Sequence, residues 1–177
     1  EIGIARQAQD GTWREVLLSD EHGVLRQGYD EIYTVVQLAN GDFLVQDSWG
    51  GAVKSYDSQT GKLKKTYDEA CYSFQVLGQK LYIANMSGII KVYDTITAKE
   101  LEQIIYPVTD HANVIHVTNE GIYVFNGGGI QYKSNAGDIW ETVVEPTRTS
   151  LTRADHALAT AYAWRTHEYI LSFYSEG

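Results

Sequence analysis

Four aspartates stand at comparable places along the chain, each followed at once by Glu or His and then by an apolar run. Carboxylates that converge repel one another, raise one another's pKa and favour a hard cation such as Ca²⁺. If the apolar runs are equivalent strands around one axis, these side chains are candidate calcium ligands; otherwise each caps a turn. The candidate ligands are Asp30, Asp68, Asp110 and Asp155.

Two of these aspartates are followed by histidine, at His111 and His156. Imidazoles in this position are candidate ligand-binding groups, general bases or transition-metal ligands. The alternative is that both are repeat residues bonded to turn carbonyls. The sequence has no Gly-x-Ser-x-Gly elbow for a serine nucleophile. Cys71 is the single cysteine, which excludes an internal disulfide and a cysteine-based metal site.

A second group of candidate ligand-binding residues lies at glycine-rich turns. Trp49, Met86 and Asn126 each stand beside or close to Gly in such a turn. An exposed Trp or Met at a loop tip suits stacking on a sugar or anchoring a protein partner. Trp49 fits equally well between packed sheets. Residues 85–87 also form an Asn-x-Ser glycosylation triplet, a pattern that arises often by chance.

The composition excludes several classes of partner. The net charge of −9 argues against nucleic acid, which is bound mainly through Lys and Arg. No apolar stretch approaches the roughly 20 residues needed to span a bilayer, so we expect no membrane insertion. The first residue, Glu1, is consistent with a removed export signal or a trimmed chain. We expect an extracellular or periplasmic location.

An internal repeat in the sequence predicts the strands that position the candidate site residues. The stretch from Gly41 to Lys62 recurs 37 residues later, from Gly78 to Lys99. The best-matched part is Tyr-Asp-Ser-Gln-Thr-Gly-Lys at 56–62, which returns as Tyr-Asp-Thr-Ile-Thr-Ala-Lys at 93–99. Short alternating apolar runs separated by Gly and Asn turns, at a period in the upper thirties, indicate the blade of a β-propeller.

The repeat predicts an all-β chain forming one propeller domain, 1–177, with four antiparallel strands in each of four blades. The fourth blade is composite, because Gly3-Ile4 and Trp13 parallel Gly129-Ile130 and Trp140 at the strands that the C-terminal repeat lacks. The alternative is a fragment of a larger propeller, whose ring does not close on itself. The expected blades are 31–67, 70–105, 111–145, and 152–177 joined with 1–19.

The segment 51–62, Gly-Ala-Val-Lys-Ser-Tyr-Asp-Ser-Gln-Thr-Gly-Lys, resembles the repeats of the YVTN/PQQ-like and WD40-like propeller superfamily. Those blades carry an apolar strand, a Tyr-Asp or Trp-Asp pair and a Thr-Gly-Lys turn, and the copy at 88–99 resembles them equally. The Gly-His pair typical of WD40 repeats is missing. The resemblance implies the architecture, with ligands on the loop face over a central channel, and it does not specify an activity.

Three functions remain open on this basis. The first is a non-catalytic binding or assembly module that recognises a protein or a glycan on its loop face. The second is part of a propeller enzyme, of the quinoprotein or the lyase/hydrolase kind, with an acidic and histidine-containing site at the mouth of the channel. The third is a structural component of a larger particle, which predicts self-association through a blade edge. A calcium ion in the channel is the one cofactor expected.

Overall fold

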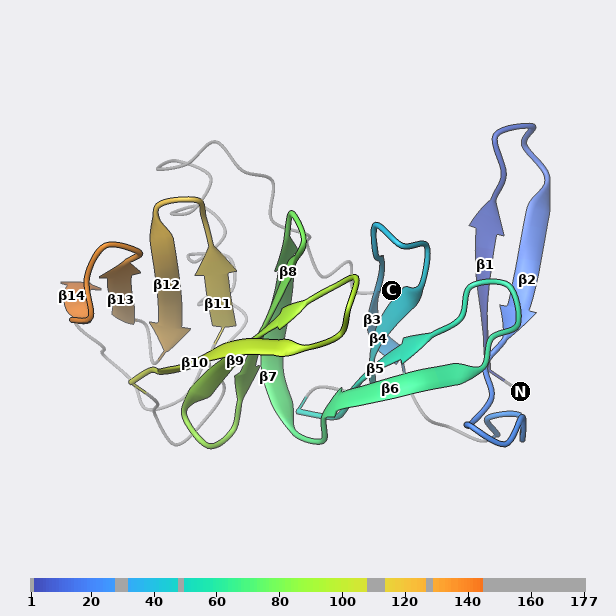
Figure 1. Ribbon diagram of the computed structural model, residues 1–177, viewed down its shortest axis with the longest axis horizontal. Helices are drawn as coiled ribbons and strands as arrows, with labels where there is room; N and C mark the ends of the chain where they lie inside the picture. Colours follow the sequence, from blue (N-terminus) through green and yellow to red (C-terminus); the bar gives the residue numbers. More distant parts are fainter. Residues whose placement is uncertain (1, 28–31, 48–49, 108–113, 127–128, 145–177) are drawn as a thin grey trace. The chain divides into compact units, whose positions relative to one another are not determined.

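A computed structural model describes residues 2–27, 32–47, 50–107, 114–126 and 129–144. Within these ranges every regular element is a β-strand (Figure 1), which confirms the all-β class. The described part of the chain contains no helix long and apolar enough to cross a membrane.

The strands form three antiparallel sheets of four strands, each with its strands in chain order, and one hairpin. The hairpin is β1 (Gly3–Gln7) and β2 (Trp13–Leu17). The first sheet contains β3 (Ile32–Gln37), β4 (Phe43–Asp47), β5 (Val53–Tyr56) and β6 (Leu63–Asp68). The second contains β7 (Cys71–Leu77), β8 (Lys80–Asn85), β9 (Ile89–Asp94) and β10 (Glu100–Ile105). The third contains β11 (Val114–Val117), β12 (Gly121–Asn126), β13 (Gly129–Ser134) and β14 (Glu141–Val144).

Successive four-stranded meanders of this kind are the building units of a propeller, so the architecture is propeller-like. The hairpin at the N-terminus is also present as expected, with Ile4 opposite Val16. Residues 152–177, which were expected to complete its sheet, lie outside the described residues. The composite fourth blade, the closed ring and the boundaries of the single domain therefore stay predictions.

The chain divides into two compact units, and each contains two neighbouring sheets. The first unit is Glu1–Cys71 with Asp94–Lys99, and the second is Tyr72–Tyr93 with Glu100–Gly177. In the first unit the hairpin and the first sheet share one core, which contains Leu18, Phe43, Val45 and Tyr56. In the second unit the second and third sheets share another, which contains Ala84, Ile90, Val92, Tyr106, Ile115, Val117, Ile122 and Val124.

The repeated Tyr-Asp motif forms the third turn of a sheet, the turn that joins its third and fourth strands. In the first sheet Asp57 Oδ1 accepts hydrogen bonds from the amides of Gln59 and Thr60. The bond from the Thr60 amide is the largest of the effects that lower the pKa of Asp57. Asp94 accepts bonds from Ile96 and Thr97 in the same way. The repeat is therefore a turn that an aspartate carboxylate caps.

The third turn of the first sheet also docks on the hairpin. The Ser19 amide donates to Gly61 O at 2.9 Å, and the Leu63 amide donates to Ser19 O at 2.9 Å. A Cβ on Gly61 would overlap the carbonyl oxygen of Leu17. The fold therefore requires glycine at position 61 for its close approach to the end of β2.

Two further third turns dock on a preceding fourth strand. Lys65, on β6, donates from Nζ to Ala98 O at 2.5 Å in the third turn of the second sheet. Trp140, which ends the third turn of the third sheet, donates from Nε1 to Ile105 O at 2.9 Å. Ile105 is the last residue of β10. Each of these sheets thus uses the same turn to hold the fourth strand that precedes it in the chain.

Inner strands of the second unit are joined by side chains that imitate a strand ladder. Gln75 on β7 donates from Nε2 to Val117 O and accepts from the Val117 amide at Oε1, both at 2.7 Å. Ser73 Oγ accepts a further bond from the Ile115 amide at 2.9 Å. These bonds satisfy backbone groups of β11 that would otherwise be left unpaired next to the core.

We predict that Gly61→Ala lowers the free energy of unfolding by roughly 2–4 kcal/mol, because the added methyl group overlaps the Leu17 carbonyl. Positive φ alone does not account for this, since Ala98 adopts φ 57 at the equivalent repeat position. The control is Gly41→Ala, where φ is 89 but the nearest heavy atom is the Ser58 hydroxyl at 3.8 Å. We expect it to cost about 1 kcal/mol. Equal losses in urea unfolding of the two variants would contradict the docking account.

Candidate functional site

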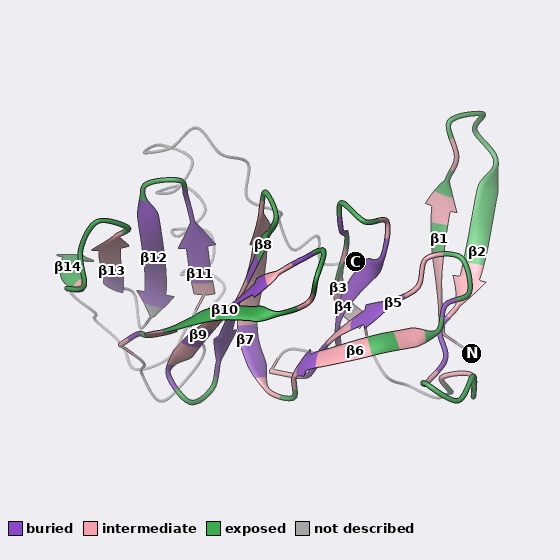
Figure 2. Ribbon diagram, viewed as in Figure 1, coloured by how far each residue is buried: buried purple, intermediate pink, exposed green. Residues whose placement is uncertain are grey.

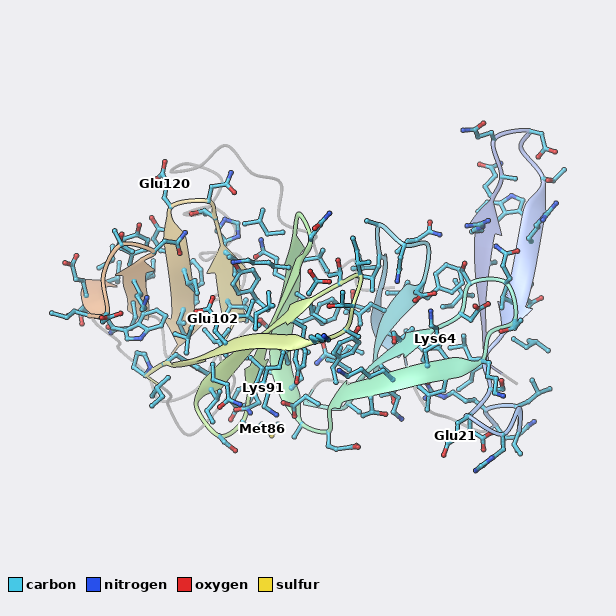
Figure 3. All side chains as sticks on the ribbon, viewed as in Figure 1. Glu21, Lys64, Met86, Lys91, Glu102 and Glu120 are labelled. Atoms are coloured by element: carbon cyan, nitrogen blue, oxygen red, sulfur yellow. The ribbon has the colours of Figure 1, made fainter. Side chains whose placement is uncertain are left out.

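Three of the residues expected to bind a ligand, Trp49, Met86 and Asn126, belong by their sequence positions to the second turn of a sheet, the turn that joins its second and third strands. Met86 follows β8, and its side chain is 42% exposed (Figure 3). Asn126 ends β12 and pairs through its backbone with Gly129. Trp49, His111 and His156 lie outside the described residues, as does the side chain of Asn126. Of the five predicted ligand-binding residues, Met86 is the one whose side chain the structure describes.

The turn that carries Met86 is held by the side chain before it. Asn85 Oδ1 accepts hydrogen bonds from the Ser87 amide at 2.9 Å and the Ile89 amide at 3.1 Å. Asn85 O accepts a bond from the Tyr106 hydroxyl at 2.7 Å. These bonds join Asn85 to Ser87, Ile89 and Tyr106 and so hold the turn from which the Met86 thioether projects. Asn85 is itself 7% exposed, so the glycosylation triplet is not an accessible acceptor in the folded chain.

An ionic network stands directly before the second turn of the first sheet. Asp47 ends β4 and forms salt bridges to Arg26 Nη1 at 2.8 Å and Lys54 Nζ at 2.9 Å. Arg26 also donates to the Tyr56 hydroxyl at 3.0 Å. The Asp47 amide donates to Ala52 O across the hairpin. These bonds tie β4, β5 and the segment before β3 together on both sides of the turn.

Burial and charge act in opposite directions on the cations of this network. Burial alone would lower the pKa of Lys54, but the hydrogen bond and the charge of Asp47 outweigh it and leave the pKa raised. The same balance raises the pKa of Arg26. Burial raises the pKa of Tyr56, which keeps its hydroxyl neutral. The network is therefore a structural brace with two cations on one carboxylate.

The proposed calcium ligands are described at one position. Asp68 ends β6, and its Oδ1 accepts a hydrogen bond from the Ala70 amide at 3.1 Å, so it does cap a turn. Asp30, Asp110 and Asp155 lie outside the described residues. Within those residues no group of three or more His, Cys, Asp and Glu side chains is arranged to hold a metal ion. A calcium site formed by the four aspartates stays a prediction.

Sequence reasoning missed the network around Asp47. The Asp47–Lys54 ion pair could have been predicted, because the two residues flank the glycine turn of a hairpin that the repeat predicts. The Arg26–Asp47 ion pair has no such pattern in the sequence. Arg26 belongs to a segment without repeat character and reaches Asp47 from 21 residues away.

We predict that Asp47→Asn lowers the free energy of unfolding by about 2 kcal/mol near neutral pH, since it removes the anion from two partly buried cations. The folded pKa of Lys54 is raised. The contribution of the Lys54–Asp47 ion pair to the free energy of unfolding is therefore complete below the ordinary lysine pKa of about 10.4. It is lost as the pH rises through the pKa of Lys54 in the folded protein. The difference between wild type and variant, measured by urea unfolding, should be constant from pH 7 to 9 and shrink at higher pH. A difference that grows above pH 10 would refute this assignment.

No protein-family model matches the sequence. No curated protein matches it either. Among solved structures, the chain is similar to the computationally designed Ika8 protein, with 18% identity and a TM-score of 0.55 over 85% of this chain and 49% of that one. It is also similar to the RRP9 WD40 repeats, with 9% identity and a TM-score of 0.49 over 70% of this chain and 41% of that one. The chain thus spans about half the length of the designed protein, and the first likeness concerns the fold alone.

Proposed function

We propose that this chain is a non-catalytic binding module that recognises a protein partner through the second turns of its sheets. The observation that carries the proposal is Met86, an exposed thioether at the tip of a turn whose backbone is fixed by Asn85 and Tyr106. A flexible, polarizable side chain adapts to an apolar pocket of a partner. A turn that is rigid before binding loses little conformational entropy when the partner arrives.

The brace around Asp47 supports the same proposal in the first sheet. It fixes the strands on both sides of the turn to which Trp49 belongs. Trp and Tyr are among the residue types that contribute most to protein interfaces. A glycan partner, an extracellular or periplasmic location and an enzymatic role at the aspartates and histidines of the predicted channel stay predictions.

The proposal is tested with Met86→Glu and its matched control Met86→Leu, using arrayed proteins and arrayed glycans as probes. Met86 is exposed, so neither variant should change the thermal unfolding midpoint by more than a degree or two. We expect capture of a protein, an affinity at least about tenfold weaker for Met86→Glu, and an affinity within about twofold for Met86→Leu.

Two outcomes count against the proposal. If the chain binds arrayed glycans and no arrayed protein, the partner is a glycan and the proposed protein partner is wrong. A captured protein that binds Met86→Glu as tightly as wild type would show that the β8–β9 turn is not part of the interface.

A further inference from the structure

Two arginines face each other across the N-terminal hairpin. Arg6 on β1 is directly opposite Arg14 on β2, so their side chains leave the same face of the hairpin with Cβ atoms about 5 Å apart. Like charges in such a pair are unfavourable. Arg14 is exposed and Arg6 is half-buried, and Figure 2 shows much of β2 exposed. The chain thus keeps a local concentration of positive charge in spite of its net charge of −9.

The arginine pair has no carboxylate to neutralise it. Within the described residues, neither arginine forms an ion pair or a side-chain hydrogen bond. The two acidic side chains of the hairpin are placed elsewhere. Asp10 Oδ1 accepts hydrogen bonds from the amide and the hydroxyl of Thr12 in the turn. Glu15 lies on the opposite face, where its Oε1 would be 3.1 Å from a Cβ on Gly3.

Three other cations of the same unit do have carboxylate partners. Arg26 and Lys54 share Asp47, as described above. Lys64 Nζ is 2.7 Å from Asp42 Oδ2. With 23 acidic and 14 basic residues, the chain has carboxylates in excess. The arginine pair differs from these cations because it combines two positive charges with no anion in the described part of the chain.

The hairpin presents the arginine pair on a rigid support. Ile4 and Val16 lie on the same face as the pair, one step nearer the base, and pack against the core of the first unit. At the other end the Ala8 amide donates to Thr12 O at 2.7 Å and closes the turn. An anion that binds here orders two side chains and does not have to order the backbone, which lowers the entropic cost of binding.

We propose that Arg6 and Arg14 together bind one dianionic phosphate group, as found in phosphoserine or inorganic phosphate. Such a group carries close to two negative charges near pH 7 and has three acceptor oxygens. Two guanidinium groups match it, because each donates two parallel hydrogen bonds. A carboxylate or a phosphodiester has one negative charge and would neutralise only one arginine. The site belongs to the first unit alone and does not depend on the proposed function of the second turns.

The first experiment measures binding of the full chain to fluorescent peptide pools by anisotropy. The pools have randomised flanks around phosphoserine, glutamate or serine, and inorganic phosphate is added as a competitor. We expect the phosphoserine pool to bind at least about tenfold more tightly than the other two. Competition by inorganic phosphate at the concentration of the peptide would identify free phosphate as the source of the group, and its failure would identify a phosphorylated protein. Equal binding of the glutamate pool, or no binding of any phosphate probe, overturns the proposal.

The second experiment locates the site with variants. Arg6→Gln and Arg14→Gln should each weaken phosphate binding at least about tenfold, and Arg14→Lys, which keeps the charge but not the fork, a few-fold. Lys80→Gln removes one exposed charge from β8 and is the matched control, with affinity within about twofold of wild type. Neither glutamine variant should lower the thermal midpoint, since each relieves a like-charge pair. A lowered midpoint, unchanged affinity in both glutamine variants, or an equal loss in Lys80→Gln overturns the proposal.

Discussion

The hydrogen bonds between a third turn and the strand before it are the interaction on which this fold depends; they join backbone to backbone at the first joint and side chain to backbone at the next two. At the first joint Ser19 donates to Gly61 and Leu63 donates to Ser19, so a residue beyond the hairpin enters the edge of the next sheet. A four-stranded sheet with two apolar faces is not stable alone, and it must be held in register with a neighbour. The aspartate cap fixes the shape of the turn, and the small residue at its corner sets how closely the turn approaches.

This division of labour supports the proposal that the second turns bind a partner. The two copies of the repeat share Tyr-Asp and Thr, and these residues have structural roles. Tyr56 packs in the core, and Asp57 with Thr60 forms the turn. The second turns are held by other side chains, Asn85 in one sheet and Asp47 in another, and vary in sequence at their tips. Variation on a fixed support is what a binding surface requires, since the support stays rigid while specificity changes.

Most strands could be predicted from the sequence because their signals are local. Alternating apolar residues bounded by Gly and Asn turns predict strands at 33–38, 42–47, 52–56 and 63–67, and the strands of the first sheet begin and end within one residue of these limits. The turn that follows Asp57 could be predicted in the same way. The alternative that Asp68 caps a turn is confirmed, because its carboxylate accepts a hydrogen bond from the Ala70 amide. Interactions between distant segments had no such signal. The Arg26–Asp47 bridge and the overlap that reserves position 61 for glycine both depend on tertiary contacts between segments without shared periodicity.

Native-state hydrogen exchange at Ser19 and Leu63 tests the central claim most directly. Ser19 follows β2 and Leu63 begins β6, and the amide of each is bonded across the joint between the hairpin and the first sheet. If this joint holds the sheets together, both amides exchange as slowly as those of the buried strand β4, because they open only when the unit unfolds. Exchange at the rate of an unstructured peptide would show that the turn rests on the hairpin without holding it, and would contradict the account.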